Sequence, residues 1–268
     1  MSVLQLGAGD DVRISAPVAR ANPVAKLAVA LLISVMLLLT VDVVTAGTAL
    51  VCELAVLPWC GLSARGLLRR GWIVLAGAIP AGLVTAWLGL DSGAVLLAVG
   101  PITVTQGSLL AGCAVTLRIL SVGLPGVVLL ATTDPTDLAD ALAQVARLPH
   151  RFVLAALAAM RLFALIGTEW QSLGAARRAR GLGDDGALGR ARTAVGQVLA
   201  LLVLVIRRGT RLSMAMEARG FGLPGPRTWA RQSRLRWSDA LVLAGGLVIV
   251  TVATVAGLLA GTWHLALA

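Results

Sequence analysis

Three aspartates spaced three residues apart could hold a metal ion or a metal-bound diphosphate: Asp134, Asp137 and Asp140. Clustered acids of this kind would suit a membrane-embedded metal-dependent transferase. The same stretch also carries the residues that begin a helix. Asp134 suits the N-cap, Pro135 the first helical position and Asp137 the positive end of the helix dipole. We therefore predict a helix start here and keep the transferase as an alternative.

No other set of residues predicts a metal, redox or nucleotide site. Cys52, Cys60 and Cys113 lie in apolar segments without metal-binding spacing, and the two histidines, His150 and His264, are far apart. Lys26 is the only lysine, and no glycine-rich turn leads into it, which excludes a P-loop ATPase within this chain. We expect neither a metal nor a cofactor.

The composition is that of a membrane protein. Of 268 residues, 58% are apolar and 13% are charged, about half of the charged share of a soluble domain. The net charge is +10, and most of the excess lies in residues 134–236, which hold 16 arginines against 7 acids. A basic surplus often indicates nucleic acid, but in a membrane protein it marks a segment kept in the cytoplasm. We expect a lipid bilayer and no nucleic acid as partner.

Five apolar stretches predict membrane-spanning helices, because about 20 residues cross a bilayer. In chain order they cover residues 27–41, 43–60, 71–90, 107–131 and 240–267. Ser238 and Asp239 are candidate N-caps of the last one. Residues 94–99 are apolar but too short to cross, and we predict a re-entrant or interfacial segment there.

Basic residues alternate with each crossing, as the positive-inside rule requires. The turn at Asp42 and the loop 91–106 carry none. The remaining loops carry Arg13, Arg20, Lys26, then Arg65, Arg69, Arg70, then the arginines of 134–236. We therefore place the N-terminus and residues 134–236 in the cytoplasm and the C-terminus outside, in a bacterial inner membrane.

The predicted fold class is an all-α polytopic membrane protein. It has about five transmembrane helices and a cytoplasmic helical domain with two long helices. The predicted domains are a cytoplasmic arm, a four-helix membrane region, the cytoplasmic domain and a last transmembrane helix, at residues 1–26, 27–133, 134–236 and 237–268. Glu53 and Arg118 fall within predicted spans, where ionisable groups are expensive and functional candidates. A pair between them stays open.

The two long helices are expected from about His150 to Arg180 and from about Arg190 to Arg219, after a short helix that ends near Leu148. They end alike. With Arg180 aligned on Arg219, 39 residues later, both ends read leucine, small residue, then alanine, arginine, glycine, an apolar residue and glycine. Gly181 and Gly220 suit the left-handed position that ends a helix.

An arginine at a helix end has two explanations. It can simply complement the negative end of the helix dipole. It can also enter a groove on a partner and make forked bonds to carboxylates or carbonyls. Two matching ends on consecutive helices favour the second explanation and suggest two similar partner subunits.

With these two ends, the chain resembles the T component of energy-coupling-factor (ECF) transporters, the CbiQ/EcfT-type family. The resemblance is carried by Ala179-Arg180-Gly181 and Ala218-Arg219-Gly220. The stretch Thr132–Leu142 is similar to the family's segment after the fourth span. Asn22-Pro23-Val24-Ala25-Lys26 resembles its Asp-Pro-Arg-x-Lys opening, with Asn and Val as departures.

The resemblance implies a non-catalytic subunit that docks two ATP-binding cassette subunits, with Arg180 in one groove and Arg219 in the other. It also implies one small substrate-binding membrane (S) subunit, through which vitamins or transition metals are taken up. The apolar faces Leu154–Ala164 and Val195–Ile206 would contact that subunit, or else pack on each other. A conventional permease that binds substrate itself is a further alternative.

Overall fold

A computed structural model of the protein describes residues 16–40, 42–89, 93–99, 102–181, 186–223, 228–229 and 231–262. Arg13, Leu182, Gly183 and His264, which the sequence analysis used, lie outside the described residues. The chain divides into two compact units, and each is described by itself. The bundle unit comprises the described residues of Ala8–Ala141 and Ser233–Ala268, and the α6–α7 unit those of Leu142–Gln232.

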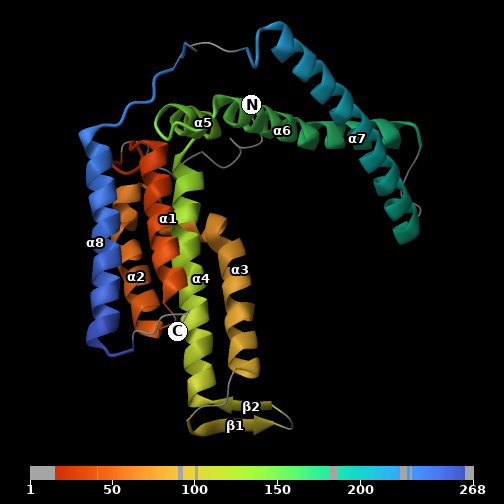
Figure 1. Ribbon diagram of the computed structural model, residues 1–268. Coiled ribbons are helices and arrows are strands. Elements are labelled where there is room, and N and C mark those ends of the chain that lie inside the picture. Colours follow the sequence, from red (N-terminus) through yellow and green to blue (C-terminus); the bar gives the residue numbers. More distant parts are fainter. Residues whose placement is uncertain are drawn as a thin grey trace. The chain divides into compact units, whose positions relative to one another are not determined.

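The bundle unit is built from five helices that run side by side (Figure 1). They are α1 (Pro23–Leu39), α2 (Val43–Val56), α3 (Ala64–Leu88), α4 (Gln106–Thr132) and α8 (Trp237–Leu259). A 3-10 turn, η2 (Leu57–Cys60), extends α2, and a short helix, α5 (Pro135–Gln144), follows α4. The all-helical prediction is confirmed, apart from one small hairpin.

Small residues let these helices approach closely, as is usual between helices in a membrane. A Cβ atom built on Gly112 of α4 would lie 2.5 Å from the carbonyl oxygen of Gly82 in α3. A Cβ on Gly246 of α8 would lie 2.7 Å from the methyl groups of Val29 in α1. Larger side chains at these glycines would therefore push the helices apart.

The core of the bundle lies between α1, α2 and α8. Ile33 and Leu37 of α1 pack with Ala46 and Ala49 of α2 and with Ile249 and Ala253 of α8. The outer faces are apolar and exposed: Leu83, Trp87 and Leu130 are each more than half exposed. An apolar exterior around a core of alanine, leucine and isoleucine fits a lipid environment.

Five helices among the described residues are long and apolar enough to cross a membrane, judged by length and composition. Four of them match predicted spans: Val43–Cys60, α3, α4 and α8. The predicted first span is α1, an apolar helix of 17 residues. The fifth candidate is α6 (His150–Ala179), which we assigned to the cytoplasm. That assignment stays a prediction.

Two local predictions were wrong. The last membrane helix has Arg236, not Ser238 or Asp239, as its N-cap. Asp239 lies in the first turn, and its carboxylate accepts a 2.6 Å hydrogen bond from the Arg236 backbone N–H, the return half of a capping box. The third helix begins at Ala64, seven residues before the predicted start, because Ser63 caps it by accepting from Gly66 N at 3.1 Å.

Residues 94–99 were expected to form a re-entrant or interfacial segment, and the structure has a β-hairpin there, whose place relative to a membrane stays a prediction. Strand β1 (Val95–Val99) pairs antiparallel with β2 (Ile102–Thr105). The second strand is a run of β-branched residues, which favour extended backbone. Hydropathy detected the apolar run but not its pairing.

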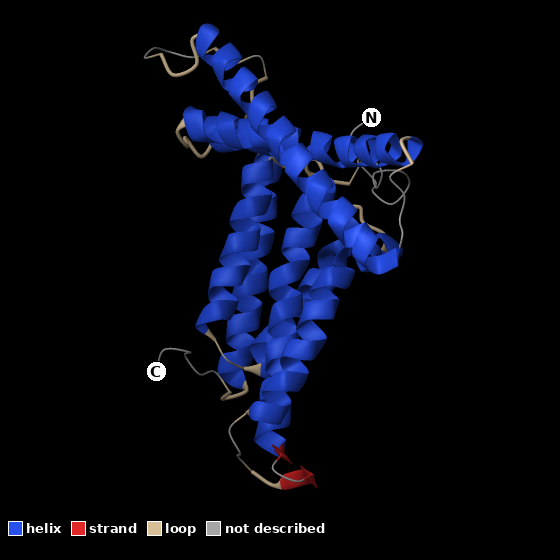
Figure 2. Cartoon of the chain, turned by 90° about the vertical axis from the view of Figure 1, so that its right-hand side faces the viewer, coloured by secondary structure: helices blue, strands red, loops and turns tan. Residues whose placement is uncertain are grey.

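The α6–α7 unit contains two long helices, α6 and α7 (Gly186–Ala218), which cross each other (Figure 2). The first matches its predicted range, and the second begins four residues earlier than predicted. Arg177 in the last turn of α6 contacts Thr193 near the start of α7, and Arg151 in the first turn of α6 contacts Gly222 just beyond the end of α7. The two helices are thus antiparallel at the crossing.

Candidate functional site

The two arginine-tipped helix ends have the same backbone geometry. At the end of α6, Arg180 N donates to Arg177 O at 3.1 Å and Gly181 N to Arg178 O at 3.0 Å. The end of α7 repeats this pattern 39 residues later, with Arg219 N to Met216 O at 3.1 Å and Gly220 N to Glu217 O at 2.9 Å. We call these ends tip 1 (residues 179–181) and tip 2 (residues 218–220).

Glycine ends both helices for a conformational reason. Gly181 has φ 71° and Gly220 has φ 79°, in the left-handed region that other residues rarely adopt. At tip 2 the Phe221 N–H also donates to Met216 O at 3.0 Å, which completes a Schellman motif. The predicted stop signals are confirmed, and each glycine fixes the direction in which its preceding arginine leaves the helix.

Both arginines face outward within the α6–α7 unit. Arg180 and Arg219 are exposed, as are Ala179 and Ala218 beside them. The ion pair that the described residues contain joins two other side chains, Glu169 and Arg208. Each tip therefore presents a guanidinium next to small residues, a shape that can enter a groove and bind carboxylates or carbonyl oxygens bidentately.

The tips lie far from each other. Arg151, at the start of α6, donates a 2.6 Å hydrogen bond to the Gly222 carbonyl just beyond tip 2. Tip 1 is at the opposite end of α6, 30 residues along. At 1.5 Å per residue this places the tips about 40 Å apart. One groove cannot hold both of them.

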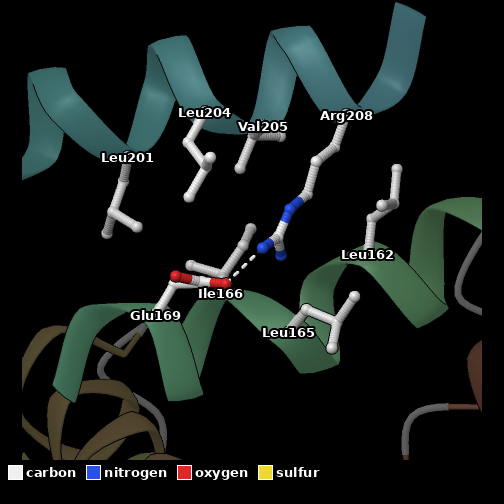
Figure 3. A pocket seen from close by; sticks show the side chains of 8 residues that line it. All are labelled: Leu162, Leu165, Ile166, Glu169, Leu201, Leu204, Val205 and Arg208. Atoms are coloured by element: carbon white, nitrogen blue, oxygen red, sulfur yellow. Dashed lines mark hydrogen bonds and ion pairs between the residues drawn. The ribbon is translucent and has the colours of Figure 1, made fainter. Parts of the chain in front are cut away.

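Polar contacts and an ion pair fix the crossing of α6 and α7. Arg177 Nη1 donates to Thr193 O at 2.8 Å, and Gln197 Nε2 donates to Trp170 O at 2.5 Å. Arg208 of α7 pairs with Glu169 of α6, and both line a recess together with leucine, isoleucine and valine side chains of the two helices (Figure 3). These contacts fix the orientation of α6 relative to α7, and so the positions of the two tips relative to each other.

The structure shows mutual packing for only part of the two apolar faces, and contact of the rest with a membrane subunit stays a prediction. Leu162 and Ile166 of α6 lie against Leu201 and Val205 of α7, so part of both faces is mutual packing. The rest of the α7 face is exposed within the chain. Its residues recur at helical spacing: Val195, Val198, Leu199, Leu202, Val203 and Ile206, each at least 53% exposed.

The structure supports the helix-start interpretation of the three aspartates. Thr136 N donates to Asp134 Oδ1 at 2.7 Å and Leu138 N to Asp134 O at 3.0 Å, so Asp134 caps α5 and Pro135 is its first residue. In the described residues, no group of three or more His, Cys, Asp or Glu side chains could hold a metal ion.

Glu53 and Arg118 do not pair. Glu53 is 5% exposed on the inner face of α2, and neither of its carboxylate oxygens has a hydrogen-bond partner in the described part of the chain. The Arg118 guanidinium instead donates to the Thr40 carbonyl at the end of α1. Arg118 thus links α4 to α1, while nothing that the structure describes accounts for Glu53.

Sequence reasoning missed one polar cluster as a site. Asn22 was noted only as part of the resemblance, and Lys26 also as the only lysine and as a cytoplasmic charge, yet both are buried and form hydrogen bonds to distant segments. The signal available in the sequence was that Lys26 is the only lysine. A lysine that begins an apolar helix needs partners close by.

Comparisons with known proteins agree with this geometry. Residues 15–230 match the model of the CbiQ family, described as "Cobalt transport protein". The "Energy-coupling factor transporter transmembrane protein EcfT" of Limosilactobacillus fermentum is 30% identical over 162 residues, 57% of this chain and 60% of that relative. The protein of the same name from Thermosediminibacter oceani is 28% identical over 168 residues, 59% of this chain and 63% of that relative.

The fold and the paired tips define a multi-pass membrane protein with a helical unit suited to docking. The family match covers most of the chain, and the protein belongs to the CbiQ family. The chain spans 60–63% of the length of these two curated relatives.

Proposed function

We propose that this chain is the energy-coupling transmembrane subunit of an ECF-type ABC transporter. It transmits ATP-driven motion from two cytosolic ATP-binding cassette subunits to one small substrate-binding membrane subunit, which takes up a vitamin or a transition metal. The observation that supports this most is the pair of matched, outward-facing arginine tips. Family membership and the names of the relatives agree with it.

The tips dock the ATPases. Arg180 enters a groove on one ATP-binding cassette subunit and Arg219 an equivalent groove on the other. The separation of about 40 Å along α6 requires two receiving sites. The flanks differ, because tip 1 has Arg178 where tip 2 has Glu217. Glu217 accepts a 3.3 Å hydrogen bond from the Ser213 hydroxyl. The grooves therefore need to share only the arginine-binding part.

Motion passes through rigid helices. When the ATPases close on ATP, the two grooves approach each other, and α6 and α7 must shift because each is held at its tip. The Glu169–Arg208 pair and the packed apolar side chains at the crossing couple the two shifts. Packed helices switch between discrete arrangements rather than deforming continuously, so a small displacement becomes a defined change of state.

The exposed apolar face of α7, from Val195 to Ile206, contacts the substrate-binding membrane subunit. Such a face needs either lipid or a protein partner to cover it. The chain itself carries no catalytic role and holds no cofactor. The N-terminus and residues 134–236 are cytoplasmic, the C-terminus is external, and the membrane is the bacterial inner membrane.

The test is the double variant Arg180→Glu with Arg219→Glu. Charge reversal turns two charge-assisted contacts into repulsion, so we expect ATP-binding cassette subunits that co-purify with the chain to fall at least about tenfold. Membrane insertion of the chain should not change, because both side chains are exposed. Quantitative mass spectrometry of affinity-purified membranes gives both amounts.

The matched control is Arg161→Glu with Arg211→Glu, which reverses one exposed arginine on each helix away from the tips. It should retain the ATPases. Retention of the ATPases and of ATP-driven uptake in the tip variant would overturn the proposal, and so would equal losses in both variants.

A further inference from the structure

Lys26 fastens the start of α1 to the end of α4. Its ammonium nitrogen lies 2.8 Å from the Ala19 carbonyl oxygen, 3.2 Å from the Thr132 carbonyl, 3.1 Å from the Thr132 hydroxyl and 3.4 Å from the Thr133 hydroxyl. Lys26 is 7% exposed. Thr132 is the last residue of α4, where exposed carbonyls and the helix dipole favour a cation. A buried ammonium with four oxygen neighbours is held in one position.

Asn22, one helical turn before Lys26, binds the start of α8. Its backbone N–H donates a 2.7 Å hydrogen bond to Asp239 Oδ1. Its side-chain amide donates to the Ser233 hydroxyl at 2.9 Å and to the Arg234 carbonyl at 3.4 Å. Asp239, 2% exposed, uses its other oxygen to hold the Arg236 N–H. The segment 233–239 is thus tied to the same turn of α1.

These two segments lie in the bundle unit beside the two points where the chain leaves for the α6–α7 unit and returns from it. The α6–α7 unit comprises Leu142–Gln232, so the chain leaves the bundle unit within α5, after Ala141, and returns to it at Ser233. Every residue of the cluster belongs to the bundle unit. The first turn of α1 and its N-cap therefore bind both the end of α4 and residues 233–239.

We propose that Asn22, Lys26 and Asp239 form a clamp through which displacement of the α6–α7 unit is transferred to the membrane bundle. The clamp residues are positioning residues. They tie both connections to one point, so that α1, α4 and α8 move together when the connections are pulled. This inference rests on the proposed coupling function and assigns its transmission point.

The clamp suits this role because its groups are polar, buried and held in place by several hydrogen bonds. Hydrogen bonds to a charged group are stronger than neutral ones, and burial raises the cost of breaking them. Without the clamp the α6–α7 unit would still be joined to the bundle by the chain, but each connection could move alone. ATP hydrolysis would then continue while less of the motion reached the bundle.

The test compares Lys26→Met with the wild-type chain in the complete transporter, purified with its ATP-binding cassette and membrane subunits and reconstituted in liposomes. ATP hydrolysis and uptake are measured on the same sample. Radioactive Co²⁺ and the labelled B vitamins serve as uptake probes, and the probe that the wild-type complex accumulates is used throughout. We expect hydrolysis within about twofold of wild type and uptake per ATP lowered about tenfold.

Two further variants separate positioning from folding. Lys26→Arg retains charged donors and should recover most of the uptake per ATP. Ser34→Ala removes a hydroxyl on the same helix that bonds only to Ala30 O of its own helix in the described contacts, and should keep the wild-type ratio. A purely structural role of Lys26 would lower complex yield, hydrolysis and uptake in parallel and leave their ratio unchanged. That outcome overturns the clamp.

If Lys26→Met prevents assembly, the double variant Thr132→Val with Thr133→Val takes its place, because it removes two hydroxyl acceptors and keeps the side-chain shape. A wild-type ratio of uptake to ATP hydrolysed in this double variant overturns the clamp, and a lowered ratio supports it.

The tip variant distinguishes the failure of the coupling function from the failure of the clamp. If Arg180→Glu with Arg219→Glu retains the ATPases, the coupling function fails. If it loses them and Lys26→Met keeps the wild-type ratio, only the clamp fails.

Discussion

Each arginine tip depends on the glycine that follows it. Gly181 and Gly220 have positive φ, and the backbone turns away from the helix axis at these residues. The arginine side chain then leaves from the last turn, beside an alanine that adds little bulk. A residue other than glycine at this position would have to adopt a strained conformation or move the arginine.

We predict that Gly220→Ala destabilises the chain by about 1 kcal/mol. Gly220 has φ 79°, and a Cβ there would lie 3.2 Å from a methyl group of Leu223. Gly209→Ala is the control, because Gly209 lies inside α7, its built Cβ has no atom within 4 Å apart from the local helix backbone, and alanine favours a helix interior. Thermal unfolding of the purified chain should show a lower midpoint for the first and an equal or higher one for the second. Equal shifts would contradict this account.

The tips could be predicted from the sequence because they are local. A terminal glycine, the arginine before it and the repeat after 39 residues are all visible in consecutive letters. The clamp could not be predicted in this way. Its bonds join residues 106 and 217 positions apart, and no short-range pattern tells which of many polar groups will meet. Glu53 was found from its charge, but its lack of a partner was not.

At the scale of elements, hydropathy predicted which segments form helices. The capping residues seen in the structure set where those helices begin and end. The helix α6 was predicted from His150 to Arg180 and runs from His150 to Ala179. The start of α3 was missed because arginines 65, 69 and 70 were assigned to a loop, whereas arginine is a good helix former. The hairpin was missed because a short apolar run does not reveal its pairing.

We predict that α6 lies wholly on the cytoplasmic side, although its length and composition would allow a span. Arg161 lies exposed within it, and an arginine inside lipid is expensive. The measurement is maleimide labelling of Phe152→Cys and Arg178→Cys, one near each end of α6, with Cys52, Cys60 and Cys113 replaced by alanine. A membrane-impermeant maleimide should label both in inverted vesicles and neither in intact cells.

Ala94→Cys, beside the hairpin, is the matched control and should be labelled in intact cells, because it lies in the predicted outer loop. Labelling of Phe152→Cys and Arg178→Cys from opposite sides would mean that α6 crosses the membrane. The two tips could not then both reach cytosolic ATPases.

At the scale of the whole molecule, the two units differ in the surfaces that they expose. The bundle unit has an apolar exterior and glycines at its closest helix contacts, and the α6–α7 unit has exposed arginine tips about 40 Å apart. Two chain connections join them, both tied to one turn of α1. In the proposed function, the ATPases act on the α6–α7 unit while the bundle unit stays embedded in lipid.

The most direct measurement of the central claim is photocrosslinking from the tips in the assembled complex. Benzoyl-phenylalanine replaces Ala179 or Ala218, and Leu88, an exposed residue at the end of α3, serves as the control position. We predict that each tip crosslinks to an ATP-binding cassette subunit, that a chain labelled at both tips carries two of them, and that Leu88 captures neither. Tips that crosslink only to lipid or to this chain would contradict the account.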